Sequence, residues 1–187
     1  MGLQPTDFSS AKKFSEVLNS FNDKYLTMRF DEFKQDSKLV IVFKGMHGDA
    51  FPGNQQCIQL ARELDASIFE YTQASNALAL IKQRMPKRLV LIGYSAGVGT
   101  VMQVGNQSNP TLSIFIAGYP TTLLKGESGV KGPYINYYQP RELDGILAGR
   151  GMKPYKPQGG EPKAVDVDHA NIVKAVTADI VSKVKAV

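Results

Sequence analysis

The sequence predicts an α/β protein, with a three-layer α/β/α sandwich around a mostly parallel central sheet. Short apolar runs rich in branched side chains alternate with segments whose apolar residues recur at helical spacing. The runs at 39–43, 88–92 and 112–117 are continuous, which is typical of strands buried on both faces. Strands that alternate with helices favour a parallel sheet covered by helices on both sides.

The strands and helices are predicted in chain order from these two patterns. A helix is expected at 9–22, capped by Ser9 or Ser10, and the alternation over 25–33 indicates an edge strand. The remaining strands are expected at 39–43, 67–71, 88–92, 112–117, 134–138 and 164–167. The remaining helices are expected at 54–64, at 74–84 (stopped by Pro86), from residue 97 to about residue 106, and at 170–186.

We predict one domain over residues 1–187. A chain of 187 residues, 43% of them hydrophobic, is long enough for one full core, and we find no repeat, low-complexity tract or linker. The stretch 145–163 is rich in glycine and proline and is expected to be a long irregular loop close to the site, where it either binds substrate or is a surface excursion.

Charge and composition limit the classes of partner. The net charge is +5, but the basic residues are scattered without an arginine-rich run, so we expect no nucleic-acid partner. Cys57 is the one cysteine, which rules out an internal disulfide, and its apolar surroundings predict a packed thiol. No apolar run is long enough to span a bilayer and no signal peptide is seen, so we expect a cytoplasmic protein.

The most informative motif is Gly93-Tyr94-Ser95-Ala96-Gly97, which joins a predicted buried strand to a predicted helix. This is the strand–turn–helix context of a nucleophile elbow. The two glycines leave room for so sharp a turn, and the turn presents the hydroxyl of Ser95 above the sheet edge. The sequence therefore predicts Ser95 as a nucleophile.

A serine nucleophile needs a general base, and the chain has two histidines. His169 lies between the last predicted strand and the terminal helix, from which it can reach back to the elbow, and we predict it as the base. His47 follows the 39–43 strand and is expected to shape the loop or the substrate cleft instead. The loop 43–49 would supply the amide of Met46 to an oxyanion hole, together with the amide of Ala96.

Together these motifs resemble the α/β-hydrolases of the lipase, esterase and thioesterase type. The loop Lys44-Gly45-Met46-His47-Gly48 is similar to the H-G-M/L-x-G oxyanion loop of bacterial lipases, with Lys44 where those enzymes usually carry histidine. The elbow and the late histidine follow the family's order of serine, acid and histidine. The resemblance runs from about residue 38 to the end, as motifs in order, and implies a compact α/β-hydrolase fold without a large cap.

The resemblance also implies an acid after the 134–138 strand. Asp144, in a turn-like Asp-Gly pair, is the first choice for it, and Glu142 is the second. Three further carboxylates remain open, namely Asp166, Asp168 and Asp49. Asp168 is adjacent to His169, so its side chain is expected to point away.

These features predict a serine hydrolase that cleaves carboxylic esters or thioesters through a Ser95–His169–Asp144 triad. Only about sixteen residues separate the strand at 112–117 from the next, too few for a lid helix, so the site is expected to be small and open. No cofactor and no metal are expected. Side chains that either line an acyl groove or pack in the core include Tyr94 and Tyr119; with His47 they form the predicted substrate-binding set.

Two kinds of alternative remain open. Amide or peptide hydrolysis, or acyl transfer, would use the same triad. A catalytically silent fold of the same class would serve as a binding protein, and the uncertain acid keeps that alternative open.

Overall fold

The computed structural model describes residues 37–118, 131–140 and 160–187. The chain divides into a unit of residues 1–37 and a unit of residues 38–187, and the described elements belong to the second. The predicted helix at 9–22 and the predicted edge strand at 25–33 lie outside the described residues, as does the loop from 145 to 159. The single domain over 1–187 therefore stays a prediction.

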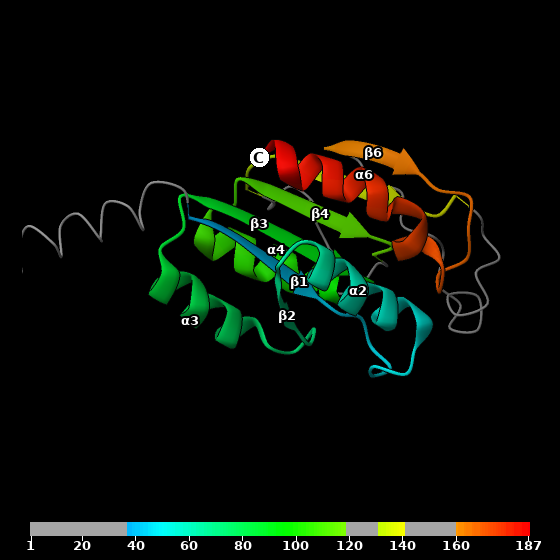
Figure 1. The fold of residues 1–187 in the computed structure, drawn as a ribbon, viewed down its shortest axis with the longest axis horizontal. Coiled ribbons are helices and arrows are strands. Elements are labelled where there is room, and N and C mark those ends of the chain that lie inside the picture. Colours follow the sequence, from blue (N-terminus) through cyan, green and yellow to red (C-terminus); the bar gives the residue numbers. More distant parts are fainter. Residues whose placement is uncertain (1–36, 119–130, 141–159) are drawn as a thin grey trace, which may run out of the picture. The chain divides into compact units, whose positions relative to one another are not determined.

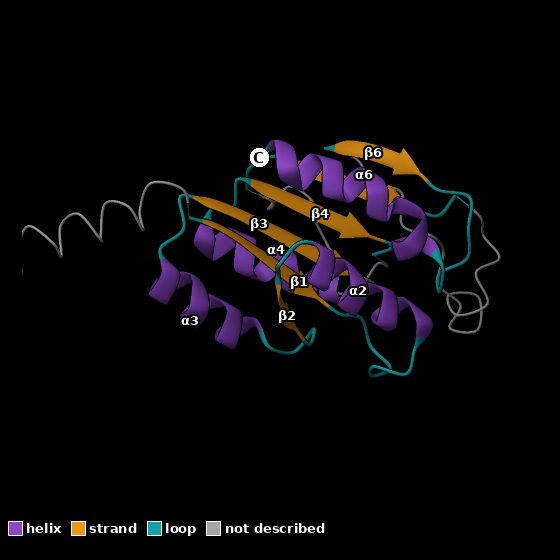
Figure 2. Ribbon diagram, viewed as in Figure 1, coloured by secondary structure: helices purple, strands orange, loops and turns teal. Residues whose placement is uncertain are grey.

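The described residues form a six-stranded sheet in the order β2-β1-β3-β4-β5-β6, and each pair of neighbours is parallel. Continuous branched runs such as that of β1 form strands that are covered on both faces (Figures 1 and 2). The predicted parallel sheet is confirmed. The strands are β1 (Lys38–Phe43), β2 (Ser67–Phe69), β3 (Arg88–Tyr94), β4 (Leu112–Ile116), β5 (Tyr134–Tyr138) and β6 (Glu161–Ala164).

Helices cover both faces of the sheet, which completes the predicted sandwich. Figure 2 shows helices on both faces of the sheet. The pair on one face is α2 and α6, which contact each other, and the pair on the other is α3 and α4. Their bounds are α2 (Pro52–Glu63), α3 (Ala74–Arg84), α4 (Gly97–Ser108) and α6 (Ile172–Ala186). Among the described residues, no helix has the length and apolarity needed to cross a bilayer.

The period of two along each strand divides the core into two layers. Val42 and Ile92 point to one face and pack with α2 and α6, whereas Ile41 and Leu91 point to the other and pack with α3 and α4. All four side chains are fully buried. β1 and β3 are therefore packed on both faces, and this packing fixes the position of their carboxyl ends.

The last strand differs from its prediction. We predicted residues 164–167, but β6 covers Glu161–Ala164. Among the described residues, β6 stands at the edge of the sheet and pairs with β5 alone, so its polar sequence and Pro162 are tolerated there. The two valines pack against the core from the segment that follows the strand. The last residues of the predicted loop 145–163 are therefore in the sheet.

A polar cluster ties α6 to the edge of the sheet. The carboxylate of Asp179 accepts hydrogen bonds from Lys163 at 2.5 Å and from the Tyr137 hydroxyl at 2.8 Å. The hydrogen bond from Lys163, and then that from Tyr137, hold the pKa of Asp179 below its usual value of 3.8. Burial, and then the neighbouring carboxylate, raise the pKa of Tyr137. Asp179 therefore stabilises the folded state most when its carboxyl group is ionised.

We expect Asp179→Asn to lower the melting temperature at neutral pH. Because the folded-state pKa of Asp179 lies below its unfolded value, its contribution is present above about pH 4 and is lost as the pH falls through the folded-state pKa. The difference in melting temperature between wild type and variant should therefore shrink between about pH 5 and about pH 2. A difference that stays constant over this range would contradict the role of the charge.

Candidate active site

Ser95 lies in the turn between β3 and α4, at the carboxyl edge of the sheet. Its φ is 53°, in the left-handed region that a residue with a Cβ adopts only under strain. The turn is held by a hydrogen bond from the Ser95 N–H to the carbonyl of Ile116 on β4, at 2.9 Å. The serine is 8% exposed, so the strained turn presents its hydroxyl from a nearly buried position.

The two glycines of the elbow are needed for close packing. A Cβ on Gly97 would lie 2.4 Å from the carbonyl oxygen of Phe43, and one on Gly93 would lie 2.6 Å from that of Gly97. Both clashes are with backbone atoms, which cannot swing aside. The glycines therefore allow the start of α4 to press against the end of β1, as expected from the motif.

The hydroxyl of Ser95 meets the imidazole of His169. The distance from Oγ to Nε2 is 2.9 Å, although the two residues are 74 positions apart in the chain. His169 follows β6 on the segment that leads into α6, and it is 3% exposed. The structure thus brings together the two residues that the sequence predicts as nucleophile and base, within hydrogen-bond reach of each other.

Tyr94 packs against His169 and binds its backbone. Its hydroxyl donates a hydrogen bond of 2.7 Å to the backbone carbonyl of His169, and the two rings lie 5.1 Å apart between centroids. The side chain is 1% exposed, and a Cβ on Gly53 would lie 2.3 Å from its hydroxyl oxygen. Tyr94 was expected either to line an acyl groove or to pack in the core. The alternation along β3 turns it into the core against His169, and a contact with substrate stays a prediction.

The other ring nitrogen of His169 contacts Gln139, the first residue after β5. Nδ1 lies 3.2 Å from Oε1 of Gln139, and Nε2 of the same side chain donates a hydrogen bond of 2.7 Å to the carbonyl of Val167. Gln139 is 4% exposed. Sequence reasoning missed this residue, although it stands at the strand end after which an acid was expected.

The loop after β1 approaches the serine closely. A Cβ on Gly45 would lie 3.0 Å from the Cβ of Ser95. Met46 follows Gly45 and is half-buried, and Ala96 follows Ser95 at the start of α4. The two residues predicted to donate amides to an oxyanion hole therefore lie on the two chain segments that meet at the serine.

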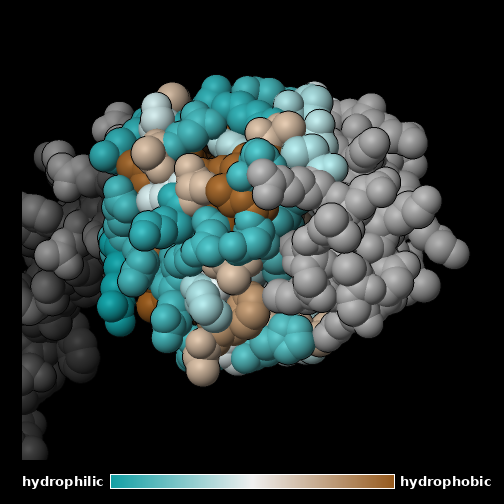
Figure 3. Space-filling model, turned by 90° about the vertical axis from the view of Figure 1, so that its right-hand side faces the viewer, coloured by the Kyte–Doolittle hydropathy of each residue, from teal (hydrophilic) through white to brown (hydrophobic). Residues whose placement is uncertain are grey.

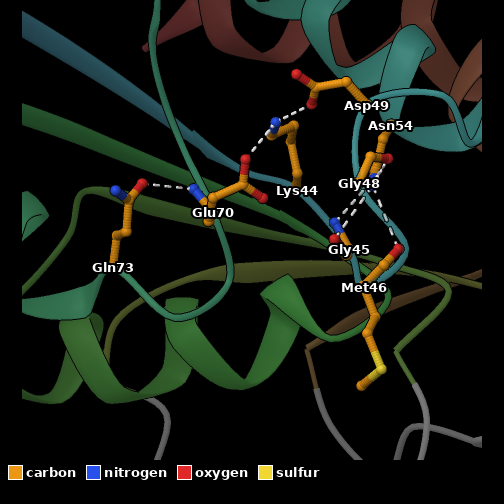
Figure 4. A network of polar contacts seen from close by, with 8 residues as sticks. All are labelled: Lys44, Gly45, Met46, Gly48, Asp49, Asn54, Glu70 and Gln73. Carbon is orange, nitrogen blue, oxygen red and sulfur yellow. Dashed lines mark hydrogen bonds and ion pairs between the residues drawn. The ribbon is translucent and has the colours of Figure 1, made fainter.

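One buried side chain, Asn54 of α2, holds this loop in shape (Figure 4). Its Oδ1 accepts a hydrogen bond of 2.8 Å from the Gly45 N–H. Its Nδ2 lies within hydrogen-bond distance of the carbonyls of Gly48 at 2.7 Å, Gly45 at 3.2 Å and Met46 at 3.3 Å. Asn54 is fully buried. The sequence offers little sign of this role, because helical periodicity marks only the apolar residues.

Lys44 anchors the base of the loop. Its ammonium forms ion pairs with Asp49 and with Glu70, the residue after β2 (Figure 4). Burial lowers the pKa of Lys44, but the hydrogen bonds to the two carboxylates outweigh it and raise the pKa above its usual value of 10.5. Lys44 therefore stays a cation at neutral pH and links the loop to the end of β2.

His47 lies on the outer side of the loop. It is exposed, its φ is 87°, and its ring centroid is 5.6 Å from that of Phe51. The substrate contact expected of His47 stays a prediction. Tyr119, the third predicted substrate contact, lies outside the described residues.

The five carboxylates that the sequence leaves open as the acid lie in different places. Asp144 and Glu142 lie outside the described residues, so the triad's third member stays a prediction. The carboxylate of Asp168 accepts hydrogen bonds from the backbone and side chain of Asn171, as expected from its turning away. Asp49 is paired with Lys44, and Asp166 is exposed on the segment after β6.

Cys57 is a buried residue of α2. It is fully enclosed in the face of α2, and burial raises the pKa of its thiol far above the usual range, only partly opposed by the charge of Lys44. A packed thiol was predicted, and a thiolate nucleophile is disfavoured here. Within residues 37–118, 131–140 and 160–187, no cluster of three or more histidine, cysteine or carboxylate residues could hold a metal ion.

Figure 3 looks at the carboxyl edge of the sheet, towards which the strand arrows point in Figure 1. Apolar surface lies there among hydrophilic residues. Parallel α/β sheets bind ligands at this edge, and both Ser95 and His169 follow strands that end there.

Comparison with solved structures gives one consistent fold. The chain is similar to an esterase from Pyrococcus furiosus (TM-score 0.57, 10% identity, 82% of each chain covered). It is also similar to a candidate hydrolase of the alpha/beta superfamily from Xanthomonas campestris pv. campestris (TM-score 0.56, 12% identity, 81% of this chain and 99% of that one). A metagenome-derived lipolytic enzyme matches with a TM-score of 0.54 at 12% identity, over 81% of this chain and 95% of that one. No protein-family model and no curated protein matches the sequence.

Proposed function

Because the chain has the α/β-hydrolase fold, we propose that it is a serine hydrolase that cleaves carboxylic esters or thioesters. The observation that carries the proposal is the 2.9 Å distance between Oγ of Ser95 and Nε2 of His169. A strained serine at an elbow, facing a buried histidine, is the arrangement of an activated nucleophile. The fold alone would not decide this, since it also hosts other activities.

The proposed reaction has two halves. His169 Nε2 accepts the hydroxyl proton as Ser95 Oγ bonds to the acyl carbon of the substrate. The carbon–oxygen or carbon–sulfur bond then breaks, and the leaving alcohol or thiol takes the proton from His169. In the second half, His169 removes a proton from water, which attacks the acyl-enzyme, and Ser95 regains its proton as the acid leaves.

The oxyanion of each tetrahedral intermediate needs hydrogen-bond donors. We assign them to the backbone N–H groups of Met46 and Ala96, on the two segments that meet at Ser95. The position of Ala96 at the amino end of α4 adds the favourable potential of the helix dipole. The proposed reaction uses only side chains and backbone amides of this chain, so it requires no cofactor.

A series of matched substrates tests the proposal. An ester, a thioester and an amide with the same short acyl group should be hydrolysed by the wild type, with the amide slowest because its leaving group is poorest. Ser95→Ala should lose all three activities, whereas Ser182→Ala, an exposed serine on α6, should keep them. Hydrolysis that persists in Ser95→Ala at the wild-type rate would refute the proposal.

The same series separates the alternative activities. An amide rate that equals or exceeds the ester rate would favour an amidase or peptidase. Transfer of the acyl group to an added alcohol in place of water would favour an acyltransferase. A folded wild type that hydrolyses none of the three would favour a binding protein.

A further inference from the structure

A buried glutamine stands where the imidazole of His169 needs an orienting partner. Gln139 is the first residue after β5, and its Oε1 lies 3.2 Å from Nδ1 of His169. Both side chains are buried, at 4% and 3% exposure. A hydrogen bond in so dry an environment has more influence on orientation than the same bond in water.

The direction of this amide is fixed from its far end. Nε2 of Gln139 donates a hydrogen bond of 2.7 Å to the backbone carbonyl of Val167. A carbonyl oxygen can only accept, so the reversed amide would place two oxygens against each other. Oε1 therefore faces His169, and an amide oxygen requires a proton on Nδ1.

The tautomer of His169 follows from that requirement. A neutral imidazole carries one proton, so with the proton on Nδ1, Nε2 holds a lone pair directed at the Ser95 hydroxyl. This is the state in which the ring can remove the serine proton. The chain of contacts from Val167 through Gln139 and His169 to Ser95 thus sets the base in its reactive form.

We propose that Gln139 is a positioning residue of His169: its neutral amide accepts a hydrogen bond from Nδ1 and fixes the orientation and tautomer of the imidazole. The proposal rests on the function proposed above. A neutral partner orients the ring and selects the tautomer, but it adds no charge that would stabilise the imidazolium formed during reaction. The predicted acid Asp144 lies outside the described residues, and the assignment of Gln139 does not depend on it.

Three variants carry the test, with hydrolysis of the matched ester as the activity. Gln139→Leu removes the amide at similar size, Gln139→Glu supplies a carboxylate, and Gln107→Leu replaces an exposed glutamine of α4 as control. We expect Gln139→Leu to lower kcat by at least about tenfold with little change in KM. In Gln139→Glu the acid limb of the pH–rate profile should move by about one unit or more, to higher pH. Gln107→Leu should match the wild type.

Nitrogen-15 NMR of His169 gives a readout that does not need activity. The wild type should show the tautomer with Nδ1 protonated, and Gln139→Leu should show a mixture of both tautomers. An unchanged tautomer and an unchanged kcat in Gln139→Leu would overturn the proposal. Failure of the proposed hydrolase function would instead appear as wild-type activity in Ser95→Ala, with the tautomer result still standing.

Discussion

Replacing His169 by alanine is expected to lower kcat for ester hydrolysis by at least about 10⁴-fold. Without the imidazole, nothing 2.9 Å from the Ser95 hydroxyl accepts its proton, and the leaving group receives none from it. Because the two residues act as one unit, the double variant Ser95→Ala/His169→Ala should be no slower than either single variant. Steady-state kinetics on the three variants checks this.

The other histidine of the chain provides the matched control. His47 is an exposed residue of the loop after β1 and a predicted substrate contact. We therefore expect His47→Ala to raise KM more than it lowers kcat. Since His169 is buried, near-ultraviolet circular dichroism should accompany the kinetics, and His169→Asn offers a second variant with less loss of volume. A loss in His47→Ala as large as that in His169→Ala would contradict the assignment of the base.

Replacing Asn54 by leucine is expected to lower kcat by about 10²- to 10³-fold, close to the effect of losing one oxyanion donor. The leucine would leave the N–H of Gly45 and the carbonyls of Gly45 and Gly48 without the partner that holds them. The loop would then relax, and the Met46 amide with it. Stability should also fall, by about 1–3 kcal/mol for each buried polar group left unpaired.

A second variant separates shape from hydrogen bonding. Asn54→Asp keeps an acceptor for the Gly45 N–H but directs a carboxylate oxygen at carbonyl oxygens. Such a carboxyl group has a raised pKa, so its destabilisation should be largest at neutral pH and relieved as the pH falls and the group protonates. Asn76→Leu, at an exposed position of α3, is the control. Wild-type kcat in Asn54→Leu would show that Asn54 does not hold the loop for catalysis.

Much of the fold follows from local patterns. The continuous branched runs at β1, β3 and β4 predict strands buried on both faces, and the helical periodicity of α3 predicts its bounds of Ala74–Arg84. The prediction fails at β6, because an edge strand needs no apolar alternation. There the pattern of Val165 and Val167 reports packing against the core rather than strand pairing.

The candidate site could be predicted where chemistry marks it in the sequence. Ser95 lies in a motif whose spacing has a steric cause, and the small number of histidines singles out His169. Gln139 and Asn54 carry no such mark, since their roles depend on partners 30 and six to nine positions away. Hydrogen bonds of this kind arise from tertiary packing, which periodicity does not encode.

Intact-mass analysis after treatment with a fluorophosphonate shows directly whether Ser95 is an activated nucleophile. This reagent bonds to a serine hydroxyl that a neighbouring base has activated. We expect one adduct on the wild type and none on Ser95→Ala. A folded wild type without an adduct, or an adduct that persists on Ser95→Ala, would contradict an activated nucleophile at the elbow.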